Sequence, residues 1–256
     1  MIEIKSKREI ELMRESCRIV ALAHKAIEDN IRPGITALEL DKIAEDVMVE
    51  NGAIAAQKNY PSPYKGVRPF PAVTCISIND VVIHGIPEAN MVLKDGDIVS
   101  VDMVALKNGY HGDMARTYLV GNVSDEAKRL VEITKKAFYE GIKYAVKGNR
   151  IGDISHAIGE FIEKNGYSVV KEFQGHGIGR SMHEDPGIPN YGRSGKGPKL
   201  EVGMTLAVEP MVIQGNDEIM ELDDGWTIVT EDGSLAAHYE NTILITEKGA
   251  EILTKV

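Results

Sequence analysis

Two segments of this sequence share one pattern, a glycine followed six positions later by an acidic residue at the end of an apolar run. They are Gly96–Asp102 and Gly203–Glu209. Each segment is expected to form a strand, and a carboxylate is costly to bury there unless it is paired or binds a cation. The repeat therefore predicts an internal duplication that brings acids from two halves of one chain together.

The segments around this pattern follow one order in both halves of the chain. Capping boxes predict helices that begin after Ser6 and Thr36 and end near positions 30 and 52. Corresponding helices are expected from Ser124 and Asp153 to near positions 148 and 166. The first pair of starts is 118 residues apart and the second pair 117. Apolar runs typical of strands lie at 72–78, 98–106, 168–173, 204–211, 227–230 and 236–246. We therefore predict an α+β fold with two helix–helix–strand halves, about 1–122 and 123–256; a chance agreement of spacings is the alternative.

Composition limits the class of protein. The chain has 256 residues, 43% of them hydrophobic, which is enough for one large core. Its formal net charge is −10 and it has no Lys/Arg-rich run, so sequence-specific binding to nucleic acid is not expected. Cys17 and Cys75 provide no disulfide framework or cysteine-type zinc motif. With no signal sequence and no membrane-length apolar run, a soluble cytoplasmic protein without membrane contact is expected.

The dipeptide Asn108-Gly109 predicts a two-residue hairpin turn, because both positions of a type I′ turn need positive φ. Asp102 would then face Ala115, and Asp113 would be the diagonal neighbour of Asp102 on the same face. Diagonal neighbours lie about 7–8 Å apart, within reach of one shared ion. A three-residue loop or a bulge would change this pairing, and acids on a strand alone are more often a solvated face.

Further candidate ligands lie at the ends of apolar runs and beside glycines. Glu209 ends one strand, and Glu240 lies in an alternating run over 238–244. His84, His176 and His183 lie in glycine-containing segments that allow close backbone approach. Carboxylates with imidazole favour two divalent ions of Mn, Fe, Co or Zn over calcium. Such ions hold a shared water as nucleophile, and the remaining imidazoles can bind a substrate carbonyl, so hydrolysis is the predicted reaction.

Six short motifs, at 75–79, 84–87, 95–99, 175–179, 208–211 and 224–227, carry a family resemblance. The chain resembles the bacterial type I methionine aminopeptidases over essentially its whole length. The resemblance implies the duplicated pita-bread fold around a central antiparallel sheet, with a single catalytic domain over 1–256. It also implies removal of the initiator Met from nascent proteins whose second residue is small.

The resemblance assigns the metal ligands residue by residue. Asp102 would chelate one of two divalent ions, His176 with Glu209 would hold the other, and Asp113 and Glu240 would bridge them. Glu209 would also accept the proton of the nucleophilic water that bridges the ions.

The resemblance also assigns the substrate contacts. His84 would contact the amide nitrogen of the scissile bond and His183 its carbonyl oxygen. The methionine pocket would be lined by Tyr60, Phe70, Cys75 and Trp226. Gln57, Met182 and a longer loop over 60–70 depart from the common bacterial pattern, and all three concern this pocket.

The family further suggests a monovalent cation on loop carbonyls near Asn79 and Val81, transient contact with the ribosome and a monomeric enzyme. Two other interpretations remain. One is a prolidase, an X-Pro peptidase on the same fold and metal set, although such enzymes usually carry an extra N-terminal domain. The other is a non-catalytic pita-bread module that binds peptides, although such relatives generally lose metal ligands.

Overall fold

The computed structural model describes all 256 residues. Its four helices are α1 (Lys7–Asn30), α2 (Ala37–Glu50), α3 (Asp125–Ile142) and α4 (Ile151–Lys164). The predicted capping boxes are confirmed, because Ser6 and Thr36 each accept the backbone N–H of a glutamate three residues on. None of the four helices combines the length and apolar character that a membrane-spanning helix needs.

Two helix boundaries differ from the prediction. α4 begins at Ile151 rather than at Asp153, because the Asp153 carboxylate reaches back to accept the N–H of Arg150, 2.7 Å away. α3 ends at Ile142, since the next bonds, such as Tyr144 N–H to Gly141 carbonyl, tighten the chain into turns. The starts of α1 and α3 are 118 residues apart and those of α2 and α4 are 114 apart, so the helices of the two halves follow the same order at similar spacings.

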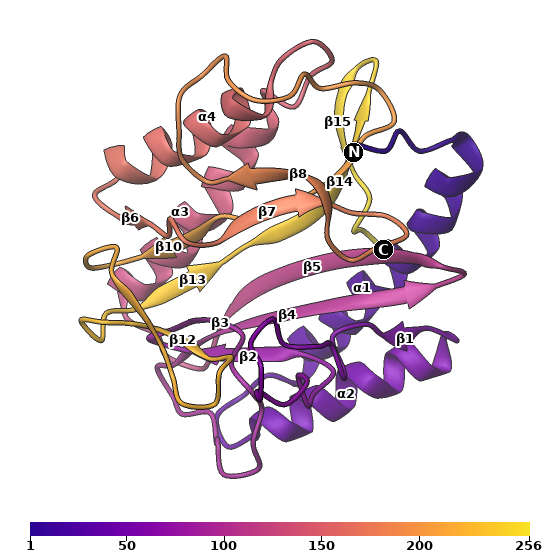
Figure 1. The fold of residues 1–256 in the computed structure, drawn as a ribbon. Coiled ribbons are helices and arrows are strands. Elements are labelled where there is room, and N and C mark those ends of the chain that lie inside the picture. The colour runs from indigo at the N-terminus through magenta and orange to yellow at the C-terminus, as the bar shows by residue number, and fades with distance from the viewer.

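Fifteen strands form one main sheet and two small ones. They are β1 (Ile54–Ala55), β2 (Cys75–Ile78), β3 (Val81–Ile83), β4 (Ile98–Lys107), β5 (Tyr110–Leu119), β6 (Ser168–Val169), β7 (Gln174–Gly177), β8 (Glu184–Pro189), β9 (Thr205–Val208), β10 (Met211–Ile213), β11 (Ile219–Glu221), β12 (Ile228–Thr230), β13 (Ala236–His238), β14 (Glu240–Thr246) and β15 (Gly249–Ile252). The main sheet has nine strands and the order β1-β4-β5-β14-β9-β7-β8, with β2 beside β4 and β15 beside β14. Two three-stranded sheets, β13-β10-β6 and β11-β12-β3, complete the fold, and their labelled strands lie toward the left of Figure 1.

The longest strand pair is the predicted hairpin. β4 and β5 pair antiparallel through ten residues, with Asp102 opposite Ala115 and Val104 opposite Asp113. Asn108 and Gly109 have φ of 53° and 79°, the positive values that a type I′ turn requires. The diagonal relation of Asp102 and Asp113 is therefore confirmed.

Several predicted strands are shorter or divided. The run over 204–211 splits into β9 and β10 around Pro210, which has no N–H for a ladder bond. The run over 236–246 splits at Tyr239, because β13 pairs with β10 whereas β14 pairs with β5 and β9. The run over 72–78 is a strand only from Cys75, since the N–H groups of Val73 and Thr74 donate to the Asp41 carboxylate instead.

The helices cover one side of the sheet and leave the other for the site. α1 and α2 lie beside β4 and β5, and α3 and α4 lie at the other end of the molecule (Figure 1). Along β4 the side chains alternate: Val99, Val101 and Met103 pack in the core with α1 and α2, whereas Asp102 and Val104 line a cavity. A second core joins α3 and α4 to β9 and β14. The α+β architecture of two helix pairs around a central antiparallel sheet is confirmed.

Candidate metal centre

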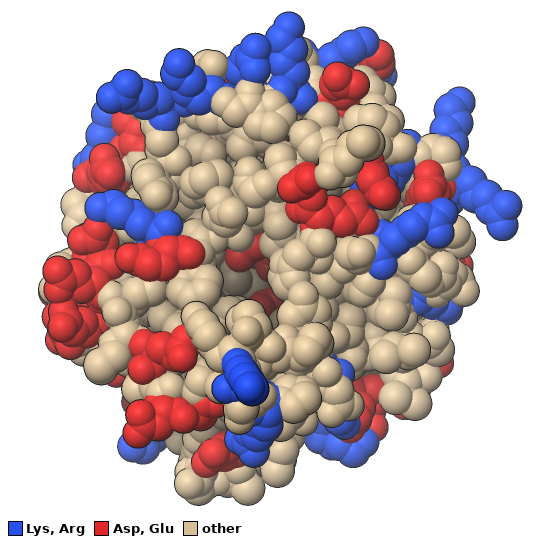
Figure 2. Space-filling model, in the orientation of Figure 1, with Lys and Arg blue, Asp and Glu red and all other residues tan.

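Five neighbouring strands of the main sheet each bring one candidate ligand to the same cavity. In sheet order, β4 carries Asp102, β5 carries Asp113, β14 carries Glu240, β9 leads directly into Glu209, and β7 carries His176. The cavity has a volume of about 520 Å³ and is lined by all five residues. Figure 2 shows it as a hollow near the middle of this face, with acidic atoms at its floor. The sequence-predicted ligand set is thus gathered in one place, with Asp113 and Glu240 on the strands between the others.

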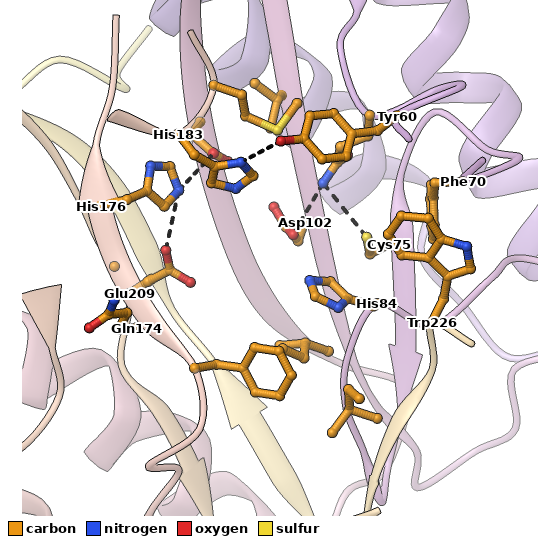
Figure 3. Close-up of a pocket in the computed structure, with 18 of the residues that line it drawn as sticks. Tyr60, Phe70, Cys75, His84, Asp102, Gln174, His176, His183, Glu209 and Trp226 are labelled. Carbon is orange, nitrogen blue, oxygen red and sulfur yellow. Dashed lines mark hydrogen bonds and ion pairs between the residues drawn. The ribbon is translucent and has the colours of Figure 1, made fainter. Parts of the chain in front are cut away.

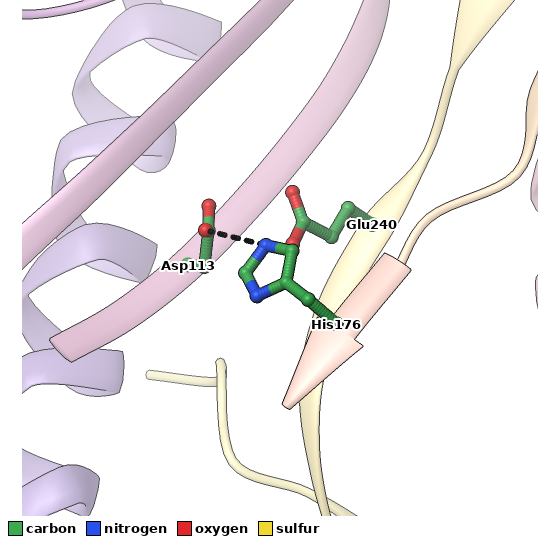
Figure 4. Close-up of side chains that lie close together, drawn as sticks. All are labelled: Asp113, His176 and Glu240. Atoms are coloured by element: carbon green, nitrogen blue, oxygen red, sulfur yellow. Dashed lines mark ion pairs between the residues drawn. The ribbon is translucent and has the colours of Figure 1, made fainter. Parts of the chain in front are cut away.

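The ligand atoms lie close together. Those of Asp113, His176 and Glu240 are all within 4.8 Å of one another (Figure 4). His176 Nε2 is 3.8 Å from Asp113 Oδ2 (Figure 4) and 3.5 Å from Glu209 Oε1 (Figure 3). Separations of this size are compatible with side chains that converge on one cation.

The four acids Asp102, Asp113, Glu209 and Glu240, called below the site acids, have no lysine or arginine partner. Burial raises the pKa of Asp102 to about 7. Burial, followed by the neighbouring carboxylates, holds the pKa values of Asp113 and Glu209 well above their usual range, and Glu240 behaves in the same way. Clustered carboxylates of this kind repel one another unless protons or cations compensate them.

Several polar atoms of the site acids have no partner. Asp102 Oδ1, Asp113 Oδ1 and Glu240 Oε1 are buried without any hydrogen bond. Buried polar atoms in folded proteins are almost always satisfied, so unsatisfied ones need an explanation. Divalent cations between these oxygens would satisfy them and offset the repulsion. The residues therefore fit the metal site that the sequence predicts.

The tautomer of His176 also suits a metal ligand. Its Nδ1–H donates to the carbonyl of Gly177, 2.9 Å away, which fixes the ring orientation. Burial is the largest cause that lowers the pKa of His176, to about 3, so the ring is neutral. Nε2 therefore carries a free lone pair and faces the carboxylates of Asp113 and Glu209.

His84 and His183 both line the cavity. His84 follows β3 with φ of 58°, an uncommon conformation for a residue with a side chain, and burial lowers its pKa to about 4. Gly85 must lack a side chain, because a Cβ there would lie 2.1 Å from the carbonyl oxygen of Ile76. His183 precedes β8, and its ring lies 4.4 Å from the ring of His176. Two neutral imidazoles thus line the same cavity as the predicted metal ligands.

The predicted methionine pocket forms one wall of the same cavity. Phe70 and Cys75 are buried in a small cluster against which Tyr60 and Trp226 pack. The rings of Phe70 and Trp226 meet edge to face at 5.3 Å, and the Tyr60 hydroxyl is 2.8 Å from His183 Nδ1 (Figure 3). This wall is apolar next to the polar ligand set.

Gln57, one of the departures from the family pattern, also lies in this wall. Its Nε2 donates to Asp102 Oδ2 at 3.2 Å and is 3.6 Å from Cys75 Sγ. Met182, another departure, lines the cavity beside His183. Gln57 therefore contacts both the pocket wall and a predicted metal ligand.

His238 was not predicted as a site residue. It is buried, its Nε2 has no hydrogen-bond partner, and that atom is 3.7 Å from Glu209 Oε2. The alternating pattern over 238–244 puts His238 on the same face as Glu240, and this pattern is the sequence signal by which His238 could have been predicted as a site residue. Thr242 on the same run holds Asp113 in place, since its hydroxyl accepts the Asp113 N–H at 3.0 Å and donates to the Asp113 carbonyl at 2.9 Å.

Comparison with known proteins agrees with this geometry. The model of metallopeptidase family M24 matches residues 11–247. A methionine aminopeptidase of Clostridium perfringens is 51% identical over 256 residues, with 100% of each chain covered. The crystal structure of the methionine aminopeptidase from Thermotoga maritima superposes with a TM-score of 0.96 at 44% identity, over 100% of each chain.

A prolidase from Pyrococcus furiosus has the same fold, with a TM-score of 0.78 and 27% identity. The match covers 99% of this chain but 65% of the prolidase. The architecture is therefore the pita-bread fold that both groups share. The full-length likeness to the methionine aminopeptidases is the stronger one. The chain belongs to metallopeptidase family M24 and, within it, to the methionine aminopeptidases, which are metallo-exopeptidases.

Proposed function

We propose that this protein hydrolyses the first peptide bond of chains that begin with Met and have a small second residue. The observation that carries this proposal is the set of five ligands from five adjacent strands, with unpaired buried oxygens, beside an apolar wall. A thioether is apolar and polarizable, which suits the wall of Tyr60, Phe70, Cys75 and Trp226.

The metal ligands would be Asp102, Asp113, His176, Glu209 and Glu240. Two divalent ions, of Co, Mn, Fe or Zn, would supply a Lewis acid and lower the pKa of the attacking water when bound. Asp102 would hold one ion and His176 with Glu209 the other. Asp113 and Glu240 would be shared, which agrees with their place on the two strands between.

Glu209 is proposed as the proton acceptor in hydrolysis. Its carboxylate faces two imidazoles, with Oε1 near His176 and Oε2 near His238. It has no lysine or arginine partner that would hold its pKa low. A positioned carboxylate beside the ions could take the proton of the attacking water and return it.

His183 and His84 are proposed to bind the scissile peptide. When the Tyr60 hydroxyl donates to Nδ1 of His183, the proton of the neutral ring stands on Nε2. That N–H can be donated to the substrate carbonyl oxygen as negative charge develops there. His84 would contact the amide nitrogen on the leaving side. Neither imidazole carries charge before substrate arrives, because burial lowers the pKa of both.

Other features of the proposal follow from family membership. We expect a monomeric cytoplasmic enzyme in one catalytic domain, which acts on nascent chains and contacts the ribosome transiently. A monovalent cation near Asn79 and Val81 is also proposed, although the Asn79 carbonyl already accepts the N–H of Ala236 at 2.8 Å. The net charge of −10 does not favour binding to nucleic acid.

Metal reconstitution with two kinds of peptide tests the function. The chelated protein would be loaded with Mn, Fe, Co or Zn one at a time, and release of the first residue would be measured for Met-Ala-Ser and for Gly-Pro. We expect cleavage of Met-Ala-Ser only, abolished by chelation and restored by at least one ion. Cleavage confined to Gly-Pro would support the prolidase alternative, and cleavage of neither would support a peptide-binding module.

A further inference from the structure

The segment before α1 lies against the loop that carries His183. The backbone N–H of Lys5 donates to the carbonyl of Gly203, 2.9 Å away, in the turn before β9. The Lys5 side chain is only 3% exposed, and its ammonium forms an ion pair with the carboxylate of Glu184, whose side chain is 10% exposed. A buried lysine is rare without such a partner, so this contact is a defined feature of the fold.

Two glycines make room for this segment. A Cβ on Gly179 would lie 2.4 Å from Lys5 Cε and 2.8 Å from Glu184 Oε1. A Cβ on Gly203 would lie 2.8 Å from Ile4 Cγ2. Gly179 is the last glycine of the motif at 175–179, and no catalytic role accounts for it. Its lack of a side chain is what lets Lys5 reach Glu184.

Glu184 connects Lys5 to the His183 loop. Its Oε2 binds Lys5, while its Oε1 accepts the backbone N–H of Ser181 at 3.1 Å and so closes a short loop around position 183. Glu184 is also the first residue of β8 and pairs with Gly177, at the point where the register between β7 and β8 shifts. Through Glu184, the ion pair with Lys5 is therefore attached to the backbone on the C-terminal side of His183.

His183 itself must be placed accurately for the proposed reaction. Its Nδ1 meets the Tyr60 hydroxyl at 2.8 Å and its ring lies 4.4 Å from His176. A displacement of about 1 Å in a group that stabilises developing charge can cost up to about 10²-fold in rate. The ion pair next to His183 is therefore in a position to control activity without touching the metal ligands.

We propose that Lys5 is a positioning residue, which acts through Glu184 to hold His183 toward the substrate. The expected effect of Lys5 on the rate rests on the proposed function. The expected effect of Lys5 on the geometry of the His183 ring does not. Ion binding should be independent of Lys5, since none of the five ligands contacts it.

The test compares four variants of the zinc-loaded protein. Lys5→Met removes the cation and keeps much of its volume, and Lys5→Met/Glu184→Gln removes both charges and leaves none unpaired. Lys5→Arg restores the cation. Arg14→Met is the matched control. Arg14 lies on α1 and, like Lys5, forms an ion pair with the β-sheet part of the fold, but its partner is Glu251 of β15, away from the cavity. The measurements are kcat and KM on Met-Ala-Ser, zinc content, and the ¹⁵N signals of the His183 ring.

We expect Lys5→Met and the double variant to lose about tenfold or more in kcat, with unchanged zinc content and shifted His183 signals. Lys5→Arg should recover most of the rate, and Arg14→Met should change neither rate nor signals. If Lys5→Met does not fold, the double variant decides. Wild-type kcat and unshifted His183 signals in a folded Lys5 variant would overturn the inference. A wild-type protein that cleaves Met-Ala-Ser with none of Mn, Fe, Co or Zn would instead refute the proposed function, while the ring signals of the zinc-loaded protein would still test the positioning.

Discussion

The chain buries carboxylates in two regions, and the two differ in what surrounds the acid. Asp41, on α2, accepts the N–H groups of Val73 and Thr74 at 3.0 and 2.7 Å and the Thr74 hydroxyl at 2.8 Å. Three of the site acids instead keep one buried oxygen with no donor at all. The difference teaches that burial of an acid does not by itself mark a functional site. Donors around Asp41 fix the loop that enters β2, whereas the lack of donors in the cavity leaves the oxygens for cations.

The largest expected effect is on the rate of hydrolysis when a site acid is neutralised. Glu209→Gln keeps the shape of the side chain but removes a predicted metal ligand and the proposed proton acceptor. We expect kcat/KM on Met-Ala-Ser to fall by about 10²–10⁴-fold or more, as loss of a positioned base does. The metal-free variant should still fold, because no hydrogen-bond donor relies on the Glu209 carboxylate as its acceptor.

Glu201→Gln is the matched control for this change. Glu201 is an exposed acid eight positions earlier in the same segment and is not part of the cavity. It should retain wild-type activity. If Glu209→Gln retained that activity as well, the metal mechanism would be wrong.

The next effect concerns stability with and without ions. Ions at about 100 times their dissociation constant should stabilise the wild type by about 2.7 kcal/mol over the chelated protein. Asp113→Asn should lose most of this gain. Its metal-free form should unfold at the same or a higher denaturant concentration than metal-free wild type, because one of the repelling carboxylates is gone.

Denaturant unfolding of both proteins, with and without chelator, measures the two differences. A metal-free Asp113→Asn variant that is clearly less stable than metal-free wild type would mean that the Asp113 carboxylate is a structural partner, like that of Asp41. The proposed difference between Asp41, which is held by donors, and the site acids, which are not, would then be wrong.

Local signals in the sequence sufficed for one part of the site. The turn at Asn108-Gly109 fixes the register of β4 and β5 through neighbouring residues alone, so the relation of Asp102 to Asp113 could be predicted. The capping boxes at Ser6 and Thr36 are equally local. Features of this kind depend on a few dihedral angles and not on the rest of the fold.

The remaining features depend on long-range pairing and were not predictable from a local pattern. The break at Tyr239 arises because β13 and β14 join different sheets, which brings His238 against Glu209. The role of Asp41 depends on Thr74, 33 positions away. Spacing predicted the Asp102–Asp113 pair, and the ends of apolar runs and the glycine-flanked histidines added further candidates. The family resemblance then selected the five predicted metal ligands and divided them between two ions.

A smaller effect is expected when the structural acid is removed. Asp41→Ala leaves the N–H groups of Val73 and Thr74 buried without an acceptor, which should cost about 2–3 kcal/mol in the free energy of unfolding. Ion binding and kcat should change little, since the cavity is untouched. Asp46→Ala, at an exposed position of the same helix, is the control and should cost under about 0.5 kcal/mol. Equal losses in the two variants would show that the donors around Asp41 contribute nothing specific.

The smallest effect extends the comparison to a buried imidazole on the helix side of β5. His24 is buried with Nε2 2.8 Å from the Met114 carbonyl and Nδ1 2.9 Å from the Tyr118 hydroxyl, and burial lowers its pKa to about 3. The folded protein therefore keeps it neutral, whereas the unfolded chain protonates it near its ordinary pKa of about 6.5. The stability that this group contributes is complete above pH 6.5 and is lost as the pH falls toward 3. Between pH 7.5 and 6 the wild type should therefore lose about 0.8 kcal/mol more than His24→Gln. Urea unfolding of the two proteins at both pH values measures this difference. Parallel pH dependences of the free energy of unfolding would show that the fold does not hold the His24 ring neutral.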